Sequence, residues 1–318
     1  MATDVRTIDD NGLGQGSDER FAEAAIAGAQ SLIDDDPGQA RWVTPLMRAV
    51  KRRRLRMPSL SPTVQRLVGL IESNEVDLDE LAAAVNGDPV LATRIMGVAN
   101  SSYFRGATQV PNVREALMRM GVREARTIVI VVALRTTVLR SPGLGSMAQT
   151  IWKHSLLTAA ATQEIASELP PWEASGFLAG LLHDLGQLVV LAYASELPAW
   201  QEDGAGPSEA IVTAISEATH APLGAMVLAS WGFPDEFCRA VMRHHDPSGG
   251  AGAVRDLARA LELGDRIAHQ IEAGWPEDVA DVPPGLVELA DRLGLDADRL
   301  HDVAAEAAAS FEALSKLA

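Results

Sequence analysis

Apolar residues recur along most of the chain at the three- and four-residue spacing of helices that bury one face. In the first half this spacing predicts helices near 18–32, 45–54, 62–71, 78–85, 89–99 and 113–120. In the second half it predicts helices near 147–168, 173–183, 188–195, 208–219, 222–231, 234–245 and 254–273, then a C-terminal helical pair. Helix-capping residues and Gly or Pro stops lie at many of the boundaries. The pattern predicts an all-α protein.

One segment departs from this picture by local propensity. Ile128, Val129, Ile130, Val131 and Val132 are all β-branched, which favours a strand. No second strand is available to pair with it, and the apolar run continues through Leu134. We therefore expect a fully buried helix here.

Breaks rich in Pro and Gly divide the helices into a two-part helical bundle. We expect a mobile tail over residues 1 to about 17 and accessory helices within 1–54. A first helical subdomain covers 55–140, and the Ser141-Pro142-Gly143 step separates it from a second subdomain over 141–273. C-terminal helices occupy 274–318.

The composition supports helices and a large core. The chain has 318 residues, of which 47% are hydrophobic and only 4% aromatic, and Ala and Leu are strong helix formers. Cys238 is the only cysteine and reads as a small buried residue, so no intrachain disulfide forms. The sequence shows no signal peptide, and its apolar runs are too short to span a bilayer, which predicts a cytoplasmic protein.

The net charge of -16 argues against nucleic acid as a partner, because a polyanion is repelled at long range. A dense basic run between Arg48 and Arg56 is the exception. It could dock an acidic partner, a nucleotide or a phosphate, although a solvated helix end is the favoured interpretation. This basic run is the only feature that supports a third interpretation, that of a DNA-binding regulator.

Candidate chemistry gathers in the second subdomain. His183-Asp184 follows an apolar helix, and Asp265 lies on a helical stripe with Leu257, Leu261 and His269, so two carboxylates should be buried. A buried carboxylate is costly unless it is paired or bound to metal. Taken singly, each of these histidines has an ordinary structural explanation: His154, His220, His244 and His245. An ordinary explanation would not account for their convergence on two buried carboxylates. The expected ligands of a working or vestigial metal site are His154, His183, Asp184, His220, His244, His245 and Asp265.

Mixed nitrogen and oxygen ligands suit one or two divalent ions of Fe, Mn or Zn, and the sequence does not choose among them. His269 and His301 read as ordinary surface or packing residues.

The order His154, His183-Asp184, Asp265 resembles the HD superfamily of metal-dependent phosphohydrolases. Segments of the first half narrow the resemblance to the HDOD branch, the HD-related output domain of bacterial signalling proteins. These segments are Leu60-Ser61-Pro62-Thr63-Val64, Asp88-Pro89-Val90-Leu91-Ala92, Val98-Ala99-Asn100-Ser101-Ser102-Tyr103-Phe104 and Glu115-Ala116-Leu117 to Gly121. The similarity runs from about Arg56 to about His269.

The resemblance implies a helical signalling or scaffolding module, since HDOD domains are generally regarded as lacking hydrolase activity. This chain keeps the full ligand series, and His220, His244 and His245 match the extra positions of two-metal HD-GYP phosphodiesterases. It lacks their Gly-Tyr-Pro segment and has Gln187 where active members commonly carry lysine.

Gln187 and Lys153 are the candidate ligand-contacting residues. A lysine at position 187 could hold a phosphate oxygen, whereas glutamine donates a hydrogen bond without charge. Lys153 lies too close to His154 on its helix to replace this missing lysine. We assign no catalytic residue. The sequence thus predicts a signalling module that binds a protein partner or a nucleotide-like small molecule, with a metal-dependent phosphohydrolase as the alternative.

Overall fold

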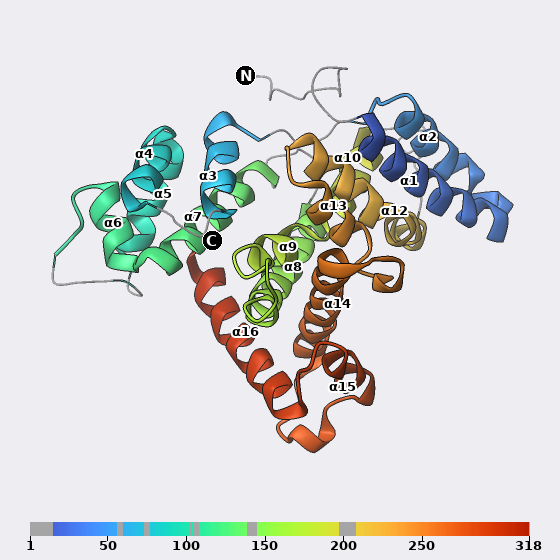
Figure 1. Cartoon of the computed structure of the whole chain (residues 1–318). Coiled ribbons are helices and arrows are strands. Elements are labelled where there is room, and N and C mark those ends of the chain that lie inside the picture. Colours follow the sequence, from blue (N-terminus) through green and yellow to red (C-terminus); the bar gives the residue numbers. More distant parts are fainter. Residues whose placement is uncertain are drawn as a thin grey trace. The chain divides into compact units, whose positions relative to one another are not determined.

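The structure, a computed structural model, describes residues 15–55, 60–72, 77–101, 104, 108–138, 145–196 and 208–317. Every regular element within these residues is helical and none is a strand, so the predicted all-α class is confirmed (Figure 1). Parts of the predicted tail, the Ser141 break and the Gly204 to Pro207 loop lie outside the described residues.

The chain forms two compact units. Unit 1 combines Met1–Ser59 with Ser141–Ala308, and unit 2 combines Leu60–Arg140 with Ala309–Ala318. The sequence pattern set 1–54 and 274–318 apart as separate segments, whereas the structure groups nearly all of their helices with unit 1. Only the last part of the C-terminal helix belongs to unit 2.

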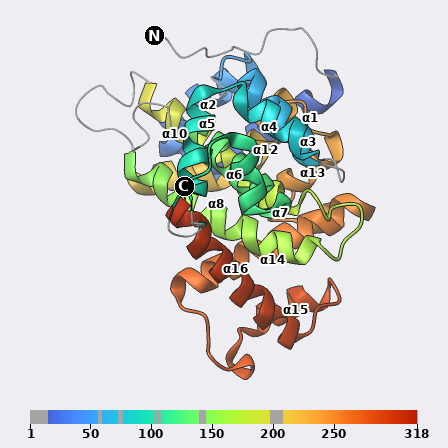
Figure 2. The same ribbon diagram turned by 90° about the vertical axis from the view of Figure 1, so that its left-hand side faces the viewer.

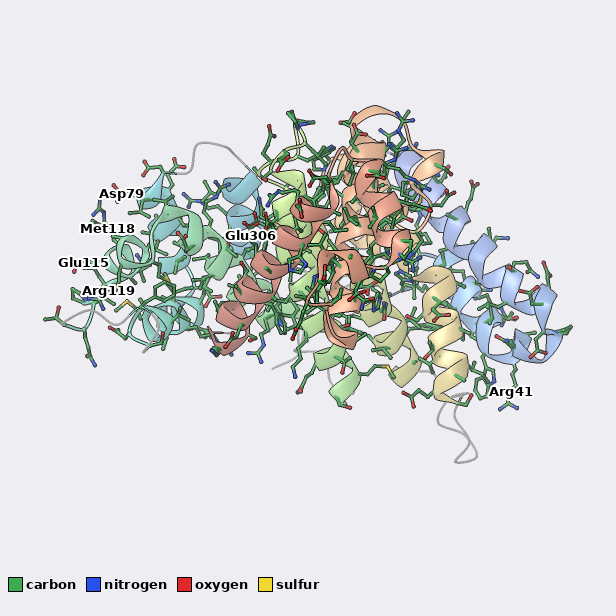
Figure 3. All side chains as sticks on the ribbon, turned by 90° about the horizontal axis from the view of Figure 1, so that it is seen from below. Arg41, Asp79, Glu115, Met118, Arg119 and Glu306 are labelled. Atoms are coloured by element: carbon green, nitrogen blue, oxygen red, sulfur yellow. The ribbon has the colours of Figure 1, made fainter. Side chains whose placement is uncertain are left out.

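Unit 2 is a bundle of short helices in which α6 packs on α4 and α5, and α7 packs on α3 and α5. These helices are α3 (Pro62–Glu72), α4 (Leu78–Asn86), α5 (Pro89–Ala99), α6 (Val113–Met120) and α7 (Val122–Val138). The β-branched run in α7 is buried and helical, as expected, because its side chains fill the bundle interior. The outer side of α4 and α6 carries Asp79, Glu115, Met118 and Arg119 (Figure 3).

Unit 1 is built around α8 (Gly145–Ala166), which packs against α9 (Gly176–Leu182) and α14 (Gly252–Ala273). All seven residues of α9 are buried, which agrees with its apolar character on every side. Around this centre lie α1 (Gln15–Asp35), α2 (Ala40–Lys51), α10 (Leu185–Glu196), α12 (Glu209–Ser230), α13 (Asp235–Met242), α15 (Pro284–Asp291) and most of α16 (Ala297–Leu317). Figure 2 gives the second view of these helices.

Two prolines that the sequence pattern placed at helix starts lie inside helices. Pro222 lies within α12, so the two helices expected over 208–231 are one, and Pro45 lies within α2. Proline removes one N–H from a helix, and tertiary packing can offset that loss. His220 is therefore an interior residue of α12 instead of a residue at a helix start.

The freed carbonyl in α12 explains Gly28 in α1. Because Pro222 has no N–H, the carbonyl of Ala218 lacks its usual helical donor. Gly28 lies directly against that carbonyl, and a β-carbon there would overlap the oxygen. The close packing of α1 on α12 thus depends on a glycine that weakens α1 locally.

A second close approach fixes the step between α9 and α10. A β-carbon at Gly186 would overlap the carbonyl oxygen of His220 and lie 2.7 Å from the nitrogen of Gly224. Gly186 follows His183-Asp184 almost immediately. The glycine therefore lets α10 lie on α12 at the point where the two helices carry candidate metal ligands.

The structure also shows where Cys238 and the basic run lie. Cys238 is fully buried on α13, as predicted. Of the basic run, Arg48, Lys51, Arg52 and Arg54 are exposed at the end of α2, Arg53 is half-buried, and Arg56 lies outside the described residues.

Two stretches, Gly176–Ala194 and Glu209–Ser230, are apolar and long enough to cross a membrane by composition, but they are 72% and 61% buried in the protein.

Replacing Gly186 with alanine should destabilise unit 1 by about 1–3 kcal/mol, because the new methyl group must displace the backbone of α12. Thermal or chemical unfolding of the two variants Gly186→Ala and Gly285→Ala measures this. Gly285 in α15 has open space around its missing β-carbon, so its alanine variant should be neutral or slightly stabilising. Equal stability of the two variants would contradict the close approach.

Candidate metal centre

Five helices and the segments after them bring the seven predicted ligands together in unit 1. His154 lies on α8, His220 on α12 and Asp265 on α14. His183-Asp184 connects α9 to α10, and His244-His245 follows α13 after one residue. All except His245 are buried.

One half of the cluster joins His154, His183 and Asp265. The Nε2 of His154 lies 2.8 Å from Oδ1 of Asp265, and the Nε2 of His183 lies 3.8 Å from the same oxygen. The second carboxylate follows directly, with Oδ2 of Asp184 3.3 Å from the Nε2 of His183. Four potential ligand atoms thus face one small volume.

The other half joins His220, His244 and His245. The Nε2 of His220 lies 3.3 Å from the Nε2 of His244 and 2.9 Å from the Nε2 of His245. It also lies 3.3 Å from Oδ1 of Asp184. Asp184 therefore stands between the halves, with one oxygen directed to each.

The tautomers of three histidines follow from their partners. The Nδ1 atoms of His183, His220 and His244 lie 2.7, 2.8 and 2.7 Å from the carbonyl oxygens of Gly180, Ser216 and Val241. A carbonyl only accepts, so each Nδ1 carries a hydrogen and donates it. In the neutral ring this leaves Nε2 as a lone pair directed into the cluster.

This arrangement fits a divalent ion. The facing Nε2 atoms of His220 and His244 are both acceptors in the neutral state, so they cannot bond to each other, and a cation would satisfy both of them. With metal–ligand bonds of about 2.1 Å, neighbouring ligand atoms on one ion lie about 3.0–3.4 Å apart. The separations within the cluster are of this size, and the imidazole and carboxylate donors suit Fe, Mn or Zn.

The protonation tendencies agree with a cation-binding cluster. Burial lowers the pKa of His183, but the charges of Asp184 and Asp265 outweigh it and raise the pKa to about 9. Burial and the neighbouring histidines hold the pKa of His244 well below its usual value. Burial alone would raise the pKa of Asp184, yet the surrounding imidazoles hold it well below the normal range. The carboxylates stay ionised and His244 stays neutral, which are the forms that bind metal, whereas His183 carries a proton near neutral pH that a bound metal would displace.

The carboxylates find their positive partners among histidines alone. Within the described part of the chain, no lysine or arginine forms an ion pair with Asp184 or Asp265. Gln187 is half-buried and Lys153 is exposed, and neither side chain makes a hydrogen bond or ion pair with another described residue. The two candidate ligand-contacting residues therefore stand beside the cluster without joining it.

Two residues that the sequence interpretation passed over belong to the surroundings of His154. Glu272 Oε2 lies 3.2 Å from Nδ1 of His154, so it can accept that hydrogen and orient the ring. The Nε2 of His269 lies 3.4 Å from Oδ1 of Asp265, and the ring centroid of His269 lies 4.3 Å from that of His154. Its side chain is 62% exposed, so the surface location was expected, but its contact with the cluster was not.

The sequence pattern that could have indicated His269 and Glu272 is their spacing from Asp265. Asp265, His269 and Glu272 recur at intervals of four and three on α14, which places them on one face. His301, in contrast, lies away from the cluster and accepts a hydrogen bond from Trp275.

A family model for the HDOD domain matches residues 57–247, more than half of the chain. The chain belongs to the HDOD family. The match includes His154, the His183-Asp184 step, His220 and His244-His245, while Asp265, α1 and α2 lie outside it.

Several proteins of known structure share this fold. A structure from Geobacter sulfurreducens, described as an HDOD domain protein with unknown function, has a TM-score of 0.62 at 18% identity and covers 93% of this chain and 99% of that one. A "Putative signal transduction protein" from Marinobacter aquaeolei VT8 has a TM-score of 0.63 at 21% identity, covering 98% and 67%. A "Putative phosphohydrolase" from Shewanella amazonensis SB2B has a TM-score of 0.59 at 22% identity, covering 86% and 98%. These likenesses show the fold.

An uncharacterized protein from Treponema pallidum (strain Nichols) is 25% identical over 198 residues. That similarity covers 60% of this HDOD chain but only 38% of the length of the Treponema protein.

Removing divalent ions should lower the melting temperature of this HDOD protein, because an ion that binds only the folded state stabilises it by about 2.7 kcal/mol at 100 times its Kd. Thermal unfolding with and without EDTA measures the effect. In His220→Ala the EDTA-dependent shift should be largely lost. His301→Ala, which removes a histidine outside the cluster, should keep it, and an equal loss in both variants would contradict the assignment.

Proposed function

We propose that this HDOD protein is a signal-transduction module that holds divalent metal in its histidine cluster and acts by binding a partner. The observation that carries the proposal is the inward direction of the Nε2 atoms of His183, His220 and His244, fixed by backbone carbonyls on their outer sides.

Metal would tie together helices that are distant in sequence. His154 and Asp265 would hold α8 to α14, and Asp184 with His220 and His244 would hold the α9–α10 step to α12 and the end of α13. Binding of this kind contributes directly to folding stability. The metal-loaded unit is therefore a rigid surface on which a signalling protein or a nucleotide-like molecule could dock. The proposed location of this activity is the cytoplasm.

Among the described residues, no lysine or arginine pairs with the cluster's carboxylates, which favours signalling over hydrolysis. Gln187 stands where a lysine would supply positive charge, and the cluster's carboxylates are paired with histidines only. Phosphoryl transfer depends on stabilising the charge that develops on the phosphoryl oxygens. The residues described around the cluster do not provide that charge.

A metal-dependent phosphohydrolase is the second candidate, and one observation favours it. The two oxygens of Asp184 face separate histidine groups, which is the arrangement of a carboxylate that bridges two ions. Divalent ions held there would act as Lewis acids toward phosphoryl oxygens. The exposed His245 and His269 mark the side from which a substrate could approach.

A hydrolysis assay separates the two candidates. Protein purified anaerobically and loaded with Fe, Mn or Zn should bind metal by elemental analysis, yet should cleave bis(p-nitrophenyl) phosphate and cyclic dinucleotides no faster than His183→Ala. Turnover at ordinary enzymic rates that is lost in His183→Ala would establish the hydrolase. Protein without bound metal would contradict both candidates.

A further inference from the structure

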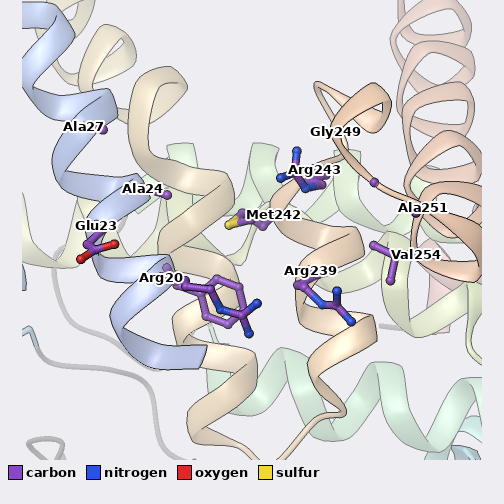
Figure 4. A pocket seen from close by; sticks show the side chains of 12 residues that line it. Arg20, Glu23, Ala24, Ala27, Arg239, Met242, Arg243, Gly249, Ala251 and Val254 are labelled. Atoms are coloured by element: carbon purple, nitrogen blue, oxygen red, sulfur yellow. The ribbon is translucent and has the colours of Figure 1, made fainter. Parts of the chain in front are cut away.

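A second candidate site lies in unit 1, in a cavity of about 600 Å³ between α1, α13 and the start of α14 (Figure 4). This volume is within the range of small-molecule sites. None of the seven cluster residues lines it. The cavity also depends on α1, which lies outside the matched HDOD segment.

Three arginines from two helices line the cavity. Arg20 lies on α1, Arg239 lies on α13, and Arg243 is the residue directly after α13 (Figure 4). Asp235 pairs with two of them, at 3.0 Å from Nη2 of Arg20 and 2.9 Å from Nε of Arg239. With Glu23 also in the lining, the local charge is three positive against two negative groups.

Arg243 is the arginine of this lining that has no counter-charge among the described residues. Its side chain is half-buried and makes no hydrogen bond or ion pair with the described residues. Its Nη1 lies over Gly249, so close that a β-carbon there would overlap it. Arg239 forms an ion pair with Asp235 through Nε but makes no hydrogen bond there, and no hydrogen bond from its Nη groups to a described residue is observed.

The start of α14 adds donors on the same side. Residues Gly250, Ala251 and Val254 line the cavity, and the N-cap Ala251 has no side-chain capping bond. The first N–H groups of this 22-residue helix therefore lack a side-chain acceptor, and a helix start attracts negative charge. Arginine side chains and a helix start are groups that commonly bind phosphate.

The remaining wall is apolar. It is formed by Phe21, Ala24 and Ala27 on α1 and by Met242 and Val254 opposite. An inorganic ion would leave this surface in contact with water. A ligand with an organic body and one strongly charged end would cover it and reach the arginines.

We propose that this cavity binds an organic phosphate of mononucleotide size, with its phosphate on Arg239 and Arg243 and its organic part against α1. A phosphate monoester carries nearly two negative charges at neutral pH, which matches two guanidinium groups and a helix start better than a single carboxylate does. None of the seven cluster residues lines this cavity, although Arg243 directly precedes His244.

Isothermal titration of the full chain as purified, without chelator, with AMP, adenosine and inorganic phosphate tests the proposal. AMP should bind, adenosine should bind at least about tenfold more weakly because it lacks the charge-assisted hydrogen bonds, and inorganic phosphate should bind more weakly than AMP. Binding of adenosine as tightly as AMP, or no binding of AMP, would overturn the proposal.

Variants locate the site. Arg243→Gln should weaken AMP binding about tenfold or more, whereas Arg292→Gln, the same charge change at an exposed position on unit 1, should leave it unchanged. Gly249→Ala keeps every charge but displaces the Arg243 side chain, so it should also weaken binding. Circular dichroism confirms folding of each variant, and AMP affinity that is equal in folded Arg243→Gln, Gly249→Ala and wild-type protein would contradict the assigned position.

Discussion

The central constraint in this protein is the convergence of buried imidazoles and two carboxylates on one small volume. His183, His220 and His244 each donate through Nδ1 to a carbonyl of the preceding turn, so each Nε2 atom faces the inner side and needs a proton, a donor or a cation there. Asp184 and Asp265 add negative charge at the same place. One or two divalent cations would satisfy these groups, and the five ligand-bearing segments of unit 1 are packed so that the groups meet.

The helix packing serves that convergence. Gly186 lets the step after His183-Asp184 lie against the backbone of α12 at His220, so two ligand-bearing segments meet through a missing side chain. The uninterrupted α12 then carries His220 in its interior despite Pro222. At its outer side the same helix receives α1 through Gly28, and α1 with α13 forms the arginine-lined cavity. One helix thus supports both candidate sites.

The sequence predicted the helical class, and it singled out the candidate metal ligands that the structure brings together, because both leave local signals. Helical spacing marks the elements, and buried positions such as Asp184 and Asp265 stand out since carboxylates are rare there. It did not predict that α12 continues through Pro222, because packing on α1 and α10 decides that outcome. The contacts of His269 and Glu272 with His154 and the cavity under α1 depend equally on long-range packing, which spacing along one helix does not reveal.

The most direct test of the metal centre is anomalous X-ray diffraction from crystals of anaerobically purified protein, recorded at the absorption edges of Fe, Mn and Zn. The account predicts anomalous density between His154, His183 and Asp265, between His220, His244 and His245, or at both places, with Asp184 adjoining. Well-ordered histidines with only water between their Nε2 atoms and no anomalous density would contradict it.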